Sequence, residues 1–150
     1  TEGKTMYREL IEKLSKGNEW VKLQEPCPES EIKKAEKYVG FRFPDELKAL
    51  LRETNGDRWL LLSAKDIIDV VKLNRKYLTE CFEPDEFEER VNRHIFFATN
   101  GCGDYFCYRV LPNGEPDTSA IYIWEHEIFE TREVAKDIAD LITGYYNDEV

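Results

Sequence analysis

Long apolar runs are missing from this 150-residue sequence, and cysteine and histidine are scarce in it. The apolar run from Trp59 to Leu62 has the length of a strand, whereas a membrane-spanning helix needs about 18 such residues. The four cysteines are too few for a disulfide scaffold, and the stretch from Thr1 to Met6 has no apolar signal core. We therefore expect a cytoplasmic protein with reduced thiols and no membrane contact.

Basic residues are also scarce in the second half of the chain. Residues 80–150 hold 5 lysines and arginines against 17 acidic residues, whereas residues 1–79 hold 16 against 14, so the net charge of −10 arises in the second half. Nucleic-acid phosphates need a basic surface, so this pattern argues against nucleic-acid binding. It favours a basic protein partner, because an acidic face accelerates the encounter. The alternative is solvated helix faces that keep the protein in solution.

Apolar residues recur at helical spacing in four segments of the first half. The predicted helices run over 6–16, from Pro28 to Gly40, from Pro44 to Asn55 and from Ser63 to Leu78. Their expected apolar stripes are Met6, Leu10 and Leu14; Ile32, Ala35 and Val39; Leu47, Leu50 and Leu51; and Ile67, Val70, Val71 and Leu78. Proline lies at the start and glycine at the end of several of these segments. Proline suits the first turn of a helix, and glycine suits the left-handed residue that follows its last turn.

The apolar period changes from 3.6 to 2 in the second half. Three strands are predicted at Ile95–Thr99, Asp104–Leu111 and Ala120–Glu125, with turns between them, and a buried strand is predicted earlier, at Arg58–Ser63. An amphipathic helix over about 131–143 closes the chain, with Val134, Ile138, Leu141 and Ile142 buried. The class is α+β: one domain over 1–150, with a central, mainly antiparallel sheet and helices at both ends.

Two sets of side chains offer catalytic or metal chemistry. Cys102, Cys107, His94 and His126 form a conceivable zinc set, but the cysteines are five residues apart and the histidines lie far away in sequence. Asp104, Glu125 and Glu127 offer paired acids for Mg²⁺-dependent hydrolysis, yet no lysine accompanies them. The turn from Asn100 to Asp104 is a tight turn rather than a phosphate loop, because no helix follows it. We predict no catalytic residue, no metal and no cofactor.

Surface residues of the second half suggest a binding function instead. If the Phe106 face of its strand is buried, Tyr105 and Arg109 lie on the outer face, and both residue types are enriched at interaction hot spots. The run Glu83, Asp85, Glu86, Phe87, Glu88 and Glu89 is acidic and self-repelling, and Glu125 and Glu127 would extend it. We predict that these residues bind the partner; the alternatives are ordinary exposed aromatics and a solvated loop.

Two blocks of the sequence resemble the SUKH superfamily, the Smi/Knr-type domain that includes bacterial toxin-immunity proteins. The first block comprises Glu31–Glu36, Gly40, Phe43–Leu47, Leu50-Leu51 and Asn55-Gly56. The second comprises Phe97–Gly101, Gly103-Asp104, Tyr105-Phe106, Ile121–Trp124 and His126-Glu127. Together they span about 29–127, and the family's closing helix fits 131–143.

The resemblance implies an α+β domain without known catalytic residues. Bacterial members are commonly immunity proteins that bind and neutralise a polymorphic toxin, often a nuclease, whereas fungal members are regulatory scaffolds. We therefore expect a bacterial immunity protein that binds a basic cognate toxin stoichiometrically. The alternatives are a regulatory interaction module and, third, a metal-dependent hydrolase that uses Asp104, Glu125, Glu127 and His126.

Overall fold

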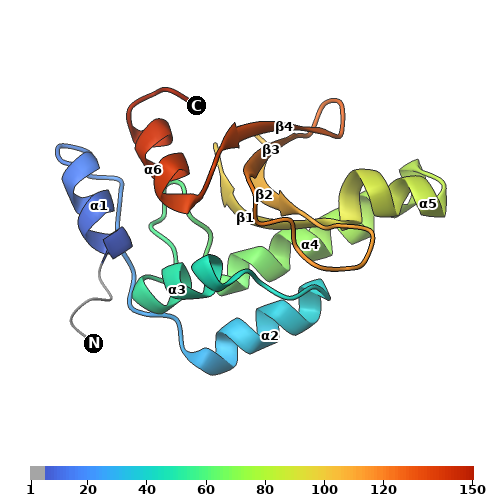
Figure 1. The fold of residues 1–150 in the computed structure, drawn as a ribbon, viewed down its shortest axis with the longest axis horizontal. Coiled ribbons are helices and arrows are strands. Elements are labelled where there is room, and N and C mark those ends of the chain that lie inside the picture. Colours follow the sequence, from blue (N-terminus) through green and yellow to red (C-terminus); the bar gives the residue numbers. More distant parts are fainter. Residues whose placement is uncertain (1–5) are drawn as a thin grey trace.

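The computed structural model describes residues 6–150, which form six α-helices and a four-stranded sheet (Figure 1). The helices are α1 Met6–Leu14, α2 Glu29–Val39, α3 Asp45–Glu53, α4 Ala64–Leu78, α5 Pro84–Phe87 and α6 Ile138–Tyr146, with a 3-10 turn η1 at Thr79–Cys81 and a π-helical turn η2 at Glu88–Asn92. All four helices predicted in the first half are confirmed. The expectation drawn from Thr1 to Met6 falls, except for Met6, outside the described residues.

Local signals explain where these helices begin and end. Gly40 follows α2 with a φ of 92°, a conformation that glycine adopts without a steric penalty. Pro44 directly precedes α3, and the Ser63 hydroxyl accepts a hydrogen bond of 3.1 Å from the Asp66 N–H at the start of α4. The backbone N–H and C=O groups at a helix terminus have no partner within the helix. These local residues provide a partner for such groups or a backbone conformation that ends the helix, so the boundaries follow from the local sequence.

The sheet is antiparallel throughout, in the order β1-β2-β3-β4. Its strands are β1 His94–Thr99, β2 Tyr105–Arg109, β3 Ile121–Glu125 and β4 Glu130–Ala135. The α+β class with a central antiparallel sheet is thus confirmed, as are the three predicted strands. The register places Arg109 opposite His94 at one end of the sheet and Tyr105 opposite Trp124 at the other.

The structure corrects two predicted elements. The first half of the expected closing helix is the fourth strand, β4, so Val134 lies in a strand and α6 begins only at Ile138. The segment predicted as a strand at Arg58–Ser63 is a loop with one β-bridge, from Leu61 to Ala98. This loop winds around the buried Asp57, whose Oδ1 accepts the N–H groups of residues 59, 60 and 61 at 2.8–3.0 Å. The same winding leaves the Trp59 side chain 41% exposed.

One face of the sheet packs on the helices and forms the larger core. Its strand residues alternate with those of the other face, as in Ile95 and Phe97, and the predicted helix stripes of α2 and α3 are buried against them. Met6 does not belong to this core: it is 53% exposed, and α1 buries Tyr7 and Ile11 instead. Figure 1 shows α1 and α6 at one side of the molecule and α5 at the other.

The opposite face of the sheet carries a smaller apolar cluster. Its buried members are Val70, Phe87, Val91, Phe96, Cys107 and Trp124. The segment from η1 through α5 to η2 supplies two of these residues. It therefore covers the face that was predicted from the sequence to be the outer face of the sheet.

Candidate functional site

The acidic run forms the short segment that lies over this second face. We call residues 79–92 the acidic segment; it comprises η1, α5 and η2. Its side chains divide by helical position, because Phe87 and Val91 point inward four residues apart while the carboxylates point outward. The exposed carboxylates are those of Glu83, Asp85, Glu86, Glu88 and Glu89.

Three contacts hold the acidic segment on the sheet. Phe87 and Val91 are 7% and 1% exposed and pack in the smaller cluster. The Trp124 indole N–H donates to the Arg90 carbonyl at 2.7 Å, which satisfies a polar group that would otherwise be costly to bury. Phe82 contacts Phe129 edge to face, with ring centroids 5.1 Å apart. The acids are therefore displayed on a fixed element rather than on a free loop.

Burial corrects the prediction for Phe87. This residue was expected on the partner-binding surface, but its ring is in the core, where an i, i+4 pairing with Val91 explains its position. Phe87 therefore acts as an anchor for the neighbouring carboxylates. Tyr105 lies on the face opposite Phe106, as expected, but its ring is half-buried, 5.5 Å from the Phe96 ring.

Arg109 lies where the acidic segment meets the end of β2. Its guanidinium carbon lies 4.9 Å from the centre of the Tyr122 ring, a cation–π contact on the second face. Arg109 is exposed, as predicted, and it lines two open grooves together with the acidic residues.

The two grooves share three residues, Glu89, His94 and Arg109. The first groove has a volume of about 520 Å³ and is completed by Asp85, Glu88, Arg93, Val110 and Pro112. The second has a volume of about 450 Å³ and is completed by Glu86, Arg90, Phe129, Glu130 and Thr131. Each groove thus brings three carboxylates and two guanidinium groups together from segments that are distant in sequence.

The β3–β4 hairpin extends this surface only in part. Glu125 is half-buried and lies 3.7 Å from Arg132, so its charge is partly balanced. Glu127 is exposed in the hairpin turn, whose Ile128 carbonyl accepts a 3.4 Å hydrogen bond from Arg90. Glu130, which the sequence did not single out, reaches the second groove.

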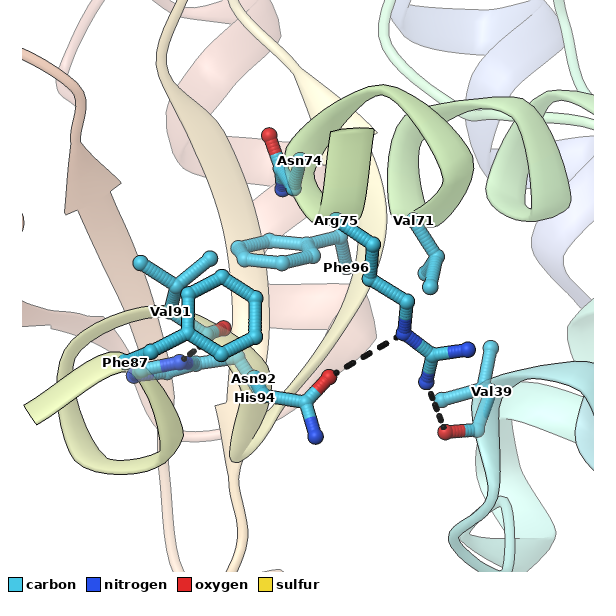
Figure 2. Close-up of a pocket in the computed structure, with 9 residues that line it drawn as sticks. All are labelled: Val39, Val71, Asn74, Arg75, Phe87, Val91, Asn92, His94 and Phe96. Atoms are coloured by element: carbon cyan, nitrogen blue, oxygen red, sulfur yellow. Dashed lines mark hydrogen bonds between the residues drawn. The ribbon is translucent and has the colours of Figure 1, made fainter. Parts of the chain in front are cut away.

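His94 is the least exposed polar group of the grooves, with 6% of its surface accessible. Its ring Nδ1 lies 2.9 Å from the Val91 carbonyl oxygen, a contact marked by a dashed line in Figure 2. The ring stacks beside the Phe96 ring, with the two centroids 5.7 Å apart. Burial lowers the pKa of His94 to about 4, and the nearby charge of Arg109 adds to this effect. His94 is therefore neutral at pH 7.

Behind His94 lies a small cavity of about 10 Å³ (Figure 2). Arg75 crosses one side of it, where its guanidinium donates to the Asn92 side chain at 3.3 Å and to the Val39 carbonyl at 3.0 Å. This space is about the size of one water molecule, so it is not a ligand pocket.

Asp104 and His126 form a pair at the opposite end of the sheet. Asp104 Oδ1 lies 2.6 Å from His126 Nδ1 and accepts the His126 backbone N–H at 3.0 Å. Burial raises the pKa of Asp104, but hydrogen bonds from His126 and Asn100 outweigh it, so the net pKa is lowered. A Cβ at Gly103 would lie 3.0 Å from the His126 ring, so the turn packs closely against this pair. The pair joins two loops.

The conceivable zinc set does not come together. His94 and Cys107 are buried in the second face, whereas Cys102 and His126 are exposed at the other end. Across residues 6–150, no group of three or more histidine, cysteine, aspartate or glutamate side chains is placed to hold a metal ion.

A model of the SMI1 / KNR4 family (SUKH-1) matches residues 26–144, most of the described chain. This match covers both sequence blocks and all four strands. No curated protein matches the chain. None of the helices within residues 6–150 is both long enough and apolar enough to span a bilayer.

Proposed function

Because the chain belongs to the SMI1 / KNR4 family (SUKH-1), we propose that it is an immunity protein that neutralises a cognate protein toxin by stoichiometric binding. The family relation is consistent with such a role, and the acidic segment supplies a surface for it. Binding, not catalysis, is the proposed activity.

The observation that carries this proposal is the fixed display of five carboxylates within residues 83–89. Like charges at this spacing repel each other, so the arrangement costs free energy in the isolated protein. A basic partner relieves the repulsion on binding and is steered to the surface by the charge. The buried Phe87 and Val91 keep the carboxylates in place, which reduces the entropy lost on association.

A nuclease-type toxin fits this surface best. An enzyme that holds nucleic-acid phosphates presents lysines and arginines where the phosphates bind. An acidic inhibitor can occupy that site or bind beside it, and either arrangement excludes the substrate. A regulatory interaction module would use the same surface with a different basic partner, so the identity of the partner decides between the two.

The test is co-expression with the toxin encoded by a neighbouring gene. The parent protein protects the cells, and the two purified proteins form a one-to-one complex. Reversing Glu86, Glu88 and Glu89 to lysine should slow association at least tenfold at low salt and weaken its salt dependence, because charged surface pairs act mainly on the association rate.

A control variant separates local charge from net charge. Glu12, Glu19 and Glu149 are exposed and lie outside the acidic segment. Their reversal to lysine changes the net charge equally and should leave the association rate within about twofold of the parent, since steering depends on where the charge lies. Both triple variants should unfold within about 0.5 kcal/mol of the parent. Equal association rates for the two triple variants would refute this surface as the interface.

Catalysis is tested in the same cells. Substituting Asp104, Glu125 or His126 singly should leave protection intact in every variant that keeps the parent's melting temperature. Loss of protection in a folded variant, with hydrolytic activity that disappears at the same time, would favour the hydrolase instead.

A further inference from the structure

His94 lies beneath both grooves with one hydrogen-bonding atom unused. The Val91 carbonyl can only accept a hydrogen bond, so the ring nitrogen facing it, Nδ1, carries the proton. In the neutral ring Nε2 is then an acceptor, and within residues 6–150 no group bonds to it. Nε2 is accessible rather than enclosed, so an occupant of the groove can donate a hydrogen bond to it.

The walls around His94 define what this occupant must be. Glu89 stands beside His94 in both grooves, with Asp85 and Glu88 in the first and Glu86 and Glu130 in the second. All of these groups accept hydrogen bonds, so the occupant must donate several and should be positively charged.

The arginines of the grooves already have partners. Arg93 donates to the Leu111 carbonyl at 2.9 Å, Arg90 contacts the Ile128 carbonyl, and Arg109 stacks on Tyr122. None of these groups bonds to a carboxylate of the acidic segment in the part of the chain that the structure describes. Apart from Glu88, which accepts a hydrogen bond from the Asn92 amide at 3.1 Å, the carboxylates therefore remain available to a group from outside.

We propose that the junction of the two grooves binds an arginine side chain of the toxin, with His94 Nε2 and the Glu89 carboxylate as its acceptors. This proposal rests on the proposed function and specifies the chemistry of the partner. A guanidinium group offers five donors in a planar fork, so it can reach an imidazole nitrogen and a carboxylate at once. A metal ion is a poorer fit, because no three metal-ligating side chains converge here within residues 6–150.

The test uses a short peptide, acetyl-Gly-Arg-Arg-Gly-amide, and ¹⁵N-labelled protein in an NMR titration. The peptide should shift the backbone resonances of Glu89, Ile95 and Arg109 saturably. The His94 Nε2 resonance should move with the same titration curve, because that atom gains a hydrogen-bond donor. The same peptide with citrulline in place of arginine keeps the shape but loses the charge, and it should bind at least tenfold more weakly.

Two single substitutions make the test specific to the groove. Glu89→Gln removes the carboxylate common to both grooves and should weaken peptide binding roughly tenfold, the effect of losing one charge-assisted hydrogen bond. Glu83→Gln removes the same charge from a residue that lines neither groove and should change the affinity less than twofold. Both residues are exposed, so both variants should fold.

Several results would overturn the arginine site. These are no saturable binding, equal binding of the citrulline peptide, equal effects of the two glutamine variants, or a His94 Nε2 resonance that stays still while the peptide binds. A lysine peptide that binds more tightly than the arginine peptide would also refute the choice of arginine. The toxin experiment is independent of this titration, so failure of the arginine site and failure of the immunity role can be told apart.

Discussion

The two faces of the sheet differ in how they are covered. The first face shares one cluster of 27 buried residues with α1, α2, α3, α4 and α6, whereas the second face shares a cluster of six with the acidic segment and α4. The large cluster consists of regular helix stripes and alternating strand residues. The small one depends on aromatic rings and on short, irregular turns.

The difference separates stability from recognition. Burial of apolar area supplies most of the folding free energy, so the first face should dominate the stability of the domain. The second face is a thin layer with charged residues outside and few apolar residues inside, and such regions open locally at lower free energy. The acidic segment is therefore the part of the molecule that can carry an unfavourable charge density without endangering the fold.

The largest effect is expected from the first face. Leu51→Ala, in the α3 stripe where Leu51 is 1% exposed, should destabilise the protein by about 2–5 kcal/mol, because it leaves a cavity in a closely packed core. Urea unfolding measures the change. Leu73, which is 52% exposed on α4, is the matched control, and Leu73→Ala should cost less than about 0.5 kcal/mol. Equal effects of the two variants would contradict the predicted stripe.

A smaller effect is expected from the second face. Phe87→Ala should cost about 2–3 kcal/mol, at or below the usual range for a buried phenylalanine, because the short acidic segment can detach locally instead of holding a cavity open. Hydrogen exchange should accelerate in residues 84–92 and remain unchanged in α3. If exchange accelerated equally in α3, the two faces would unfold as one unit and the comparison would fail.

The smallest effect concerns the pH dependence of stability, through His94. Its pKa is about 4 in the folded protein and 6.5 ordinarily, so the unfolded chain binds more protons between these values and stability falls as the pH drops. Between pH 7 and pH 5.5 the loss should be about 1 kcal/mol. The free energy of unfolding of the His94→Gln variant should lack this part of the pH dependence, whereas that of the His126→Gln variant should retain it. Identical pH profiles for the parent and His94→Gln would refute the assignment.

Much of the first face could be predicted from the sequence, because its signals are local. Gly40, Pro44 and Ser63 fix helix ends through their own backbone and side-chain chemistry, and the stripe of Leu47, Leu50 and Leu51 records which side of α3 is buried. Alternation in β2 separated the Phe106 face from the Arg109 face, and Phe106 is buried while Arg109 is exposed. Each of these features involves residues within one or two turns of each other.

For the candidate site, the sequence predicted some of the residues involved but not how they are arranged. The sequence singled out the acidic run and Arg109, but it placed Phe87 outside and considered His94 only as a metal ligand. What joins Glu89, His94 and Arg109 is the register of β1 and β2 and the course of the acidic segment over them. Contacts between residues so far apart in sequence leave no periodic signal.

The sequence by itself determined the class of fold, the helices of the first half and the excess of acid in the second. Only the tertiary structure decided that Glu130–Ala135 is a strand, because its polar residues pair with β3 at the edge of the sheet. Likewise, the Asp57 carboxylate that turns the apolar run at Trp59 into a loop is held in the core by the Tyr146 hydroxyl, which donates to its Oδ2 at 2.7 Å from 89 residues away in sequence. Local propensity is a weak preference, and a long-range hydrogen bond or strand pairing outweighs it wherever the two compete.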